Sequence, residues 1–168
     1  MPPPLRSAAP FGICYRLATD GDEPFLAEVY YSTRREEVAQ AGWPAEQQEA
    51  FLKHQHEAQH AHYKKGYGAA EWLVIERGGE GIGRLYLLEG AAELRIVDIA
   101  LIPEARRAGL GEAILRDVCE DVASRGKIVT IHVEKFNPAR RLYERLGFVP
   151  VEEKGVYDLM EWRPEAAA

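Results

Sequence analysis

The chain of 168 residues is poor in the features that define several classes of protein. Two cysteines, Cys14 and Cys119, are too few for the disulfide framework of a secreted domain. No apolar run approaches the ~18 residues of a membrane-spanning helix. With 21 basic and 27 acidic residues, the net charge of −6 argues against nucleic acid as the main partner. The sequence therefore predicts a protein of the reducing cytoplasm without a membrane or nucleic-acid partner.

The two ends of the chain carry little pattern. The first ten residues have neither a basic start nor an apolar core, so they do not resemble a secretory signal. We expect residues 1–10 to be a disordered leader and residues 164–168 a loose tail. The remainder, residues 11–163, has the length and the apolar content of one domain with its own core.

Residues 93–125 carry the strongest local pattern. The stretch from Leu94 to Ile102 is rich in β-branched and apolar residues and ends at Pro103, as a buried strand would. A helix is predicted after it, because apolar residues recur every fourth position and Gly126 stands just beyond the last turn. These apolar residues are Leu110, Ile114, Val118 and Val122.

The junction between this strand and helix reads Arg106-Arg107-Ala108-Gly109-Leu110-Gly111. Glycines let a ligand approach the backbone, and the first amides of a helix lie at the positive end of its dipole, so the junction suits a phosphate. It is neither a Gly-x-Gly-x-x-Gly motif nor a P-loop motif. Taken alone, the junction is explained equally well by a strand-to-helix turn that needs glycine only for its backbone geometry.

Two motifs together resemble the GCN5-related N-acetyltransferase (GNAT) superfamily. Arg106-x-x-Gly109-x-Gly111, after an apolar strand, resembles its acetyl-CoA pyrophosphate loop. The segment from Asn137 to Phe148 resembles its other signature, Asn-x-x-Ala-x-x-Leu-Tyr-x-x-x-Gly-Phe. The resemblance covers about residues 13–163 and implies a cytoplasmic enzyme that transfers an acetyl group from acetyl-CoA directly to a primary amine.

The predicted element order is β-α-α-β-β-β-α-β-α-β-β, with an irregular segment at 32–43 and a second helix from Pro44. It predicts an α+β (α/β/α) fold with a mixed, mostly antiparallel central sheet of about seven strands. The resemblance implies helices on both faces and a splay between the fourth and fifth strands. The predicted strands are 11–18, 71–76, 82–88, 94–102, 127–134, 148–152 and 156–162.

The resemblance implies how this chain would bind acetyl-CoA. The backbone of the fourth strand would pair with the pantetheine arm, the loop amides would bind the pyrophosphate, and the last short helix, capped by Asn137, would flank the thioester. The expected cofactor-binding residues are Ile99, Ala100, Leu101, Arg106, Arg107, Ala108, Gly109, Leu110, Gly111, Glu112, Asn137, Ala139, Arg140 and Tyr143.

The same resemblance makes Tyr143 the expected acid for the thiolate leaving group. The general base stays open. Arg95 stands where some relatives have a glutamate and cannot serve, whereas Glu93, two residues earlier, shares its face by strand alternation. Other relatives have the glutamate five residues before the asparagine, where this chain has His132, and Glu134 shares the face of His132. A water chain would be a further route for the proton. By the same alternation, Asp98 is expected to point away and to be structural.

The acceptor side is less specified. In the superfamily the segment between the first two helices lines the acceptor site, so we expect contacts to the amine from Glu36, Glu37, Trp43 and Glu46. Tyr157 is a further expected substrate contact. Acidic and aromatic side chains there favour a cationic amine, a small molecule or a peptide, and a surface loop is the alternative reading. Dimers are frequent in the superfamily, so a homodimer is compatible with the resemblance.

Two other functions compete with this prediction. His56-Glu57-Ala58-Gln59-His60 matches the His-Glu-x-x-His zinc pattern, but Tyr63 stands where one protease subtype needs glycine, and a histidine-rich helix produces such a match easily. We therefore expect no metal. A CoA-binding module without turnover is the other alternative, motivated by Arg95 at the position of the base.

Overall fold

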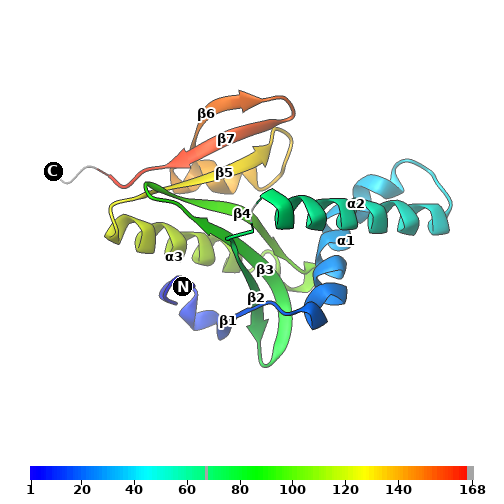
Figure 1. Ribbon diagram of the computed structural model, residues 1–168, viewed down its shortest axis with the longest axis horizontal. Coiled ribbons are helices and arrows are strands. Elements are labelled where there is room, and N and C mark those ends of the chain that lie inside the picture. The colour runs from blue at the N-terminus through cyan, green and yellow to red at the C-terminus, as the bar shows by residue number, and fades with distance from the viewer. Residues whose placement is uncertain (67, 166–168) are drawn as a thin grey trace.

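The computed structural model describes residues 1–66 and 68–165; of the expected tail, residues 166–168 lie outside this range. Seven strands form one sheet in the order β1-β2-β3-β4-β5-β7-β6, and every pairing is antiparallel except that of β4 with β5 (Figure 1). This confirms the predicted α+β sheet. The strands are β1 (Ile13–Leu17), β2 (Glu71–Arg77), β3 (Glu80–Glu89), β4 (Glu93–Leu101), β5 (Ile128–Glu134), β6 (Val149–Lys154) and β7 (Tyr157–Trp162).

Four helices cover the two faces of the sheet. The main apolar core lies between the sheet and α3 (Leu110–Ser124) with α4 (Arg140–Leu146). The helices α1 (Glu23–Ala39) and α2 (Ala45–Gly66) pack together on the other face (Figure 1). Among the described residues, no helix combines the length and the apolar character that a membrane span requires.

The sheet opens between β4 and β5. The two strands pair only from Glu93 to Ile96, opposite Ile128 to Ile131, and then diverge (Figure 1). The register of β4 against β3 shifts at the same point, which leaves Val97 as the extra residue of a β-bulge. The bulge re-aims β4 where its pairing with β5 stops, and the expected splay between the fourth and fifth strands is confirmed.

The first helix is longer than expected. Residues 32–39 were expected to be irregular, but they continue α1 to Ala39. The hydroxyls of Ser32 and Thr33 donate to backbone carbonyls three residues earlier, and Arg34 pairs with Glu37 one turn ahead. These local bonds satisfy the polar side chains within the helix, so a charged composition did not indicate a loop here.

The leader is also more ordered than expected. The amides of Arg6, Ser7 and Ala8 donate to the buried carboxylate of Asp117 in α3, at 3.0, 2.7 and 3.0 Å. Ala8 is fully buried in the main core. The expectation of a disordered segment 1–10 is wrong for these residues, because a carboxylate inside the core needs several donors and the leader supplies them.

Candidate active site

The turn between β4 and α3 holds two left-handed residues. Arg107 has φ 63° and Gly109 has φ 88°, and Gly109 is the N-cap of α3 with no side-chain cap. The amides of residues 110–112 therefore have neither an intrahelical acceptor nor a capping side chain, and they form the positive end of a 15-residue helix. This arrangement can bind an anion through backbone donors.

Gly111 is not required by the packing of the protein itself. A Cβ atom built on it would lie 3.9 Å from its nearest neighbour, the Cδ1 atom of Leu101, which is ordinary van der Waals contact. Its φ angle is also ordinary for a helix, where glycine costs stability relative to alanine. A ligand that lies close to the backbone explains this glycine better than the fold does.

Arg106 is used differently from the expectation. Its Nε donates to the carbonyl oxygen of Leu101 at 2.8 Å, and its Nη2 donates to Ser32 in α1 at 3.1 Å. The side chain thus ties the end of β4 to the other face of the sheet. A contact between this guanidinium group and a bound pyrophosphate would require these two hydrogen bonds to change.

The free edge of β4 matches the expected site of the pantetheine arm. On one side, Ile99 and Leu101 pair with Leu85 and Gly83 of β3. On the other side β4 has no β5 partner beyond Ile96. Because Arg106 occupies the Leu101 carbonyl and the backbone of Ala100 faces β3, the open part of this edge is centred on Ile99.

The segment before α4 flanks this opening. Asn137 accepts the amide of Ala139 at 2.9 Å, so it caps the turn before the helix rather than the helix itself, which begins at Arg140. Arg140 pairs with Asp158 of β7 at 2.6 Å. The side chain of Arg140 therefore joins α4 to the sheet, while Gly147 ends the helix as predicted, with φ 102°.

Tyr143 is buried at the centre of this region. Its side chain packs edge-on against Phe148, with ring centroids 5.6 Å apart, and the residue is 5% exposed. Burial and, second, the nearby carboxylate of Asp98 raise the pKa of the Tyr143 hydroxyl well above its usual value. The hydroxyl is therefore protonated at neutral pH and can donate a hydrogen bond.

Asp98 points in a different direction from the one that strand alternation predicts. Strand alternation predicts that it points away from Arg95, but the bulge at Val97 turns it toward the α1 and α2 side. There it accepts from Arg84 at 2.5 Å, and the Arg84 guanidinium lies over the rings of Tyr30 and Tyr86. A bulge leaves no mark in the hydrophobic pattern, so only the register reveals it.

The candidate bases on β4 and β5 form one polar network. Thr130 donates to Glu93 at 2.5 Å and accepts from Arg95 at 2.7 Å. The Nη1 atom of Arg95 lies 3.4 Å from Nδ1 of His132, and because arginine only donates, it faces a lone pair on that nitrogen. Burial, then Arg95 and Lys154, lower the pKa of His132, so the ring is neutral at pH 7.

A second cluster lies two residues further along β5. Glu134 accepts from Arg34 of α1 at 2.6 Å, and Tyr157 of β7 is its register partner. Burial and the Glu134 carboxylate raise the pKa of the Tyr157 hydroxyl. Tyr157 thus stands beside the polar face of β5, while Glu36 is exposed and lies outside the cavity that follows.

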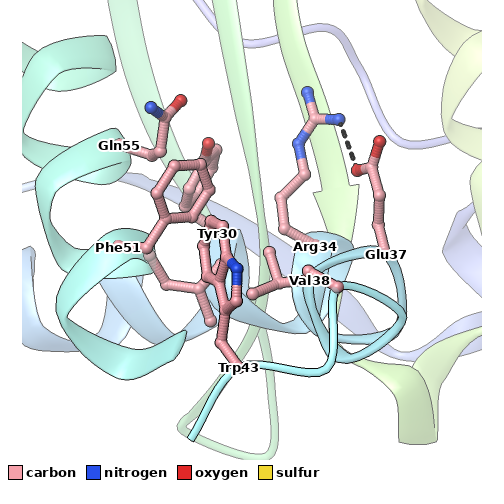
Figure 2. A pocket seen from close by; sticks show the side chains of 9 residues that line it. Tyr30, Arg34, Glu37, Val38, Trp43, Phe51 and Gln55 are labelled. Carbon is pink, nitrogen blue, oxygen red and sulfur yellow. Dashed lines mark hydrogen bonds and ion pairs between the residues drawn. The ribbon is translucent and has the colours of Figure 1, made fainter. Parts of the chain in front are cut away.

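A cavity of about 350 Å³ lies between α1 and α2, near their connection. Two of the expected substrate contacts, Glu37 and Trp43, line it, whereas Glu36 does not. Figure 2 shows the aromatic side chains gathered on one side and the Arg34–Glu37 ion pair on the other. The lining residues are Tyr30, Arg34, Glu37, Val38, Ala41, Trp43, Phe51, Leu52 and Gln55.

The comparisons with known proteins agree with this geometry. Residues 68–150, which include the turn, α3, β5 and α4, match the model of the acetyltransferase (GNAT) domain. Residues 68–150 therefore form a GNAT domain. Glucosamine 6-phosphate N-acetyltransferase of Trypanosoma brucei brucei is 35% identical over 97 residues, which are 55% of this GNAT chain and 56% of the relative. The chain thus matches little more than half the length of that curated relative.

Solved structures support the GNAT fold. The PaiA N-acetyltransferase of Thermoplasma acidophilum, in complex with coenzyme A, has a TM-score of 0.65 at 17% identity, covering 89% of this chain and 97% of that one. The putative acetyltransferase YncA of Salmonella typhimurium, with acetyl-CoA, has a TM-score of 0.51 at 19% identity, covering 94% and 97%. At these identities the likeness concerns the fold.

The histidine-rich helix of this GNAT chain is used for packing. His56 is 3% exposed and lies 5.6 Å from the ring of Tyr30, while His60 stacks on His56 and meets Trp72 edge-on at 5.1 Å. Within residues 1–66 and 68–165, no group of three or more His, Cys, Asp or Glu side chains could hold a metal ion. Among the described residues, the His-Glu-x-x-His match has no third ligand of the kind that catalytic zinc needs.

Proposed function

We propose that this protein is an acetyl-CoA-dependent N-acetyltransferase that transfers the acetyl group directly to a primary amine. The observation that carries the proposal is the uncapped, glycine-bearing start of α3 beside the open edge of β4, in a chain with a GNAT domain. The name of the trypanosomal relative and the coenzyme bound to the structural neighbours support the same activity.

The described residues fit the cofactor. The amides of residues 110–112 would bind the pyrophosphate, and the space above Gly111 lets it approach. The free edge at Ile99 would pair with the pantetheine arm as an added strand does. Asn137 and Ala139 would flank the thioester end, beside Tyr143.

The reaction forms a C–N bond and breaks the C–S bond, so a thiolate leaves and the attacking nitrogen loses a proton. A buried tyrosine whose pKa is raised is a weaker acid than a thiol with a pKa of about 8.5. We therefore assign Tyr143 the role of a hydrogen-bond donor that stabilises the developing thiolate, rather than that of an acid that gives its proton away.

His132 is the base that we propose. It follows Ile131, the last residue of β5 that pairs with β4, so it stands where the strands part. Its lowered pKa keeps the ring neutral, and the Nδ1 lone pair becomes available for the amine proton once Arg95 moves away from it. Glu93 is held by Thr130 and lies four residues before Val97, about 13 Å along the strand, which makes it a poorer candidate.

The test separates cofactor binding from turnover. Acetyl-CoA at about 100 times its dissociation constant should stabilise the wild-type protein by about 2.7 kcal/mol, a melting shift of a few degrees. Gly111→Glu should remove the shift, because its carboxylate enters the phosphate position. Gly111→Ala is the matched control, since the Cβ has room in the structure. Gly109 is a worse target, because its φ of 88° would strain any other residue.

Thiol release with a panel of primary amines then tests the transfer step. A melting shift followed by acetylation of at least one amine supports the proposal. No shift for the wild-type protein at millimolar acetyl-CoA would overturn it. A shift without thiol release from any amine would favour the alternative, a CoA-binding module without turnover.

A further inference from the structure

The cavity between α1 and α2 has the size of a small-molecule site and mostly apolar walls. At about 350 Å³ it lies within the range of ligand pockets. The rings of Trp43 and Phe51 meet edge-on at 5.2 Å, yet the two residues stay 36% and 37% exposed. An apolar ligand would cover this surface and gain the free energy of removing it from water.

The cavity is joined to the polar face of β5 through one side chain. Arg34 lines the cavity and pairs with Glu37 at 3.1 Å and with Glu134 at 2.6 Å. Glu134 lies two residues after His132 on the same strand face, a separation of about 7 Å. If the body of a molecule fills the cavity, a polar group at its end near Arg34 therefore lies close to the groups assigned to the transfer step.

The charges at this mouth favour a cation. Arg34 contributes one positive charge, and Glu37 and Glu134 contribute one negative charge each, so the cluster carries a net charge of −1. Of the described residues that line the cavity, Arg34 is the only cation, and its guanidinium group is already paired with Glu37 and Glu134. A phosphate group would find no unpaired positive charge here, whereas an ammonium group would be attracted to the mouth.

We propose that this cavity binds the carbon skeleton of the acceptor, and that the acceptor is a primary amine with an aromatic or branched apolar body. The proposal rests on the proposed transferase function only for the fate of the amine. A second ammonium group, or the hydroxyls of a sugar, would have to be desolvated against Trp43, Phe51 and Leu52. Polyamines and phosphorylated aminosugars should therefore be poor ligands for this chain.

The experiment uses 2-phenylethylamine as the probe, with spermidine and glucosamine 6-phosphate as competitors of different chemistry. Binding is measured by calorimetry without acetyl-CoA, and turnover by thiol release with it. Phe51→Ala should raise the KM and the dissociation constant for 2-phenylethylamine about tenfold with little change in kcat, because it removes one aromatic wall. Leu17→Ala, which truncates a 63% exposed apolar residue at the end of β1, is the control and should change neither value.

The outcomes distinguish this inference from the transferase function. If 2-phenylethylamine binds and Phe51→Ala weakens the binding, the cavity assignment is supported. This holds even if no amine is acetylated, because the absence of acetylation would count only against the transferase function. Acetylation of spermidine or glucosamine 6-phosphate in preference to 2-phenylethylamine would overturn the cavity assignment and leave the transferase standing. Absence of 2-phenylethylamine binding to the wild-type protein would also overturn it.

Discussion

The two faces of the sheet are stabilised in different ways. The face under α3 and α4 buries a continuous apolar cluster, from Ala8 to Met160. On the face under α1 and α2 the buried apolar cluster has only Leu26, Val74 and Tyr86, beside the buried Arg84 and His56. The first face fixes a backbone, which is what the proposed cofactor site needs. The second face presents charges and rings, which is what recognition of an amine needs.

Arg84 is where the acceptor face is most vulnerable. It is 3% exposed and paired with Asp98, so Asp98→Ala would leave a buried charge without its partner. We expect the free energy of unfolding to fall by about 3–5 kcal/mol, measured by urea denaturation. Asp98→Asn keeps an acceptor for Arg84 and should lose less. An Asp98→Ala protein as stable as the wild type would mean that ion pairing does not hold this face together.

The cofactor face should respond through catalysis rather than through stability. Tyr143→Phe keeps the packing against Phe148 and removes only the hydroxyl. We expect kcat to fall about 10²–10³-fold while the acetyl-CoA melting shift is retained, the usual cost of removing one donor to a developing charge. Turnover equal to that of the wild type would remove Tyr143 from the mechanism.

The difference between the faces also explains what could be predicted from the sequence. The apolar period of α3 and the two glycine motifs predict the cofactor face, because backbone geometry there depends on residues close in sequence. The bulge at Val97 adds one unmarked residue, and it reversed the expected direction of Asp98. The cavity depends on the relative placement of two helices, which decides that Glu37, and not its neighbour Glu36, reaches the wall.

The leader was mispredicted although the sequence held a signal for it. Asp117 lies three residues after Ile114 and next to Val118, within the apolar stripe of α3. A carboxylate in such a stripe needs buried donors, and these can come from a segment far away in sequence. Composition described residues 1–10 in isolation and could not supply that partner.

Asp117 tests whether the leader supports the cofactor face. Asp117→Ala leaves the three amides of residues 6–8 without their acceptor, and we expect a loss of about 1–3 kcal/mol in the free energy of unfolding. The leader continues to Phe11, whose ring lies 3.8 Å from the position of a Cβ on Gly109, so acetyl-CoA affinity should fall as well. Glu120→Ala, on the exposed side of α3, is the control and should stay within about 0.5 kcal/mol. Unchanged stability in Asp117→Ala would mean that the hydrogen bonds between the leader and Asp117 do not stabilise the fold.

The smallest expected effect is a pH dependence that belongs to the acceptor face. Burial, then the charges of Arg84 and His60, lower the pKa of His56 below its usual 6.5. Because the folded protein favours the neutral ring, the unfolded chain binds more protons just below pH 6.5, and stability falls as the pH drops from there toward the folded pKa. His56→Gln should flatten this part of the profile by at most about 1.4 kcal/mol per pH unit. His54→Gln changes an exposed histidine of the same helix and should leave the profile intact. Equal flattening by both variants would show that the pH dependence comes from the general charge of α2. The burial of His56 among the rings of the acceptor face would then not be its cause.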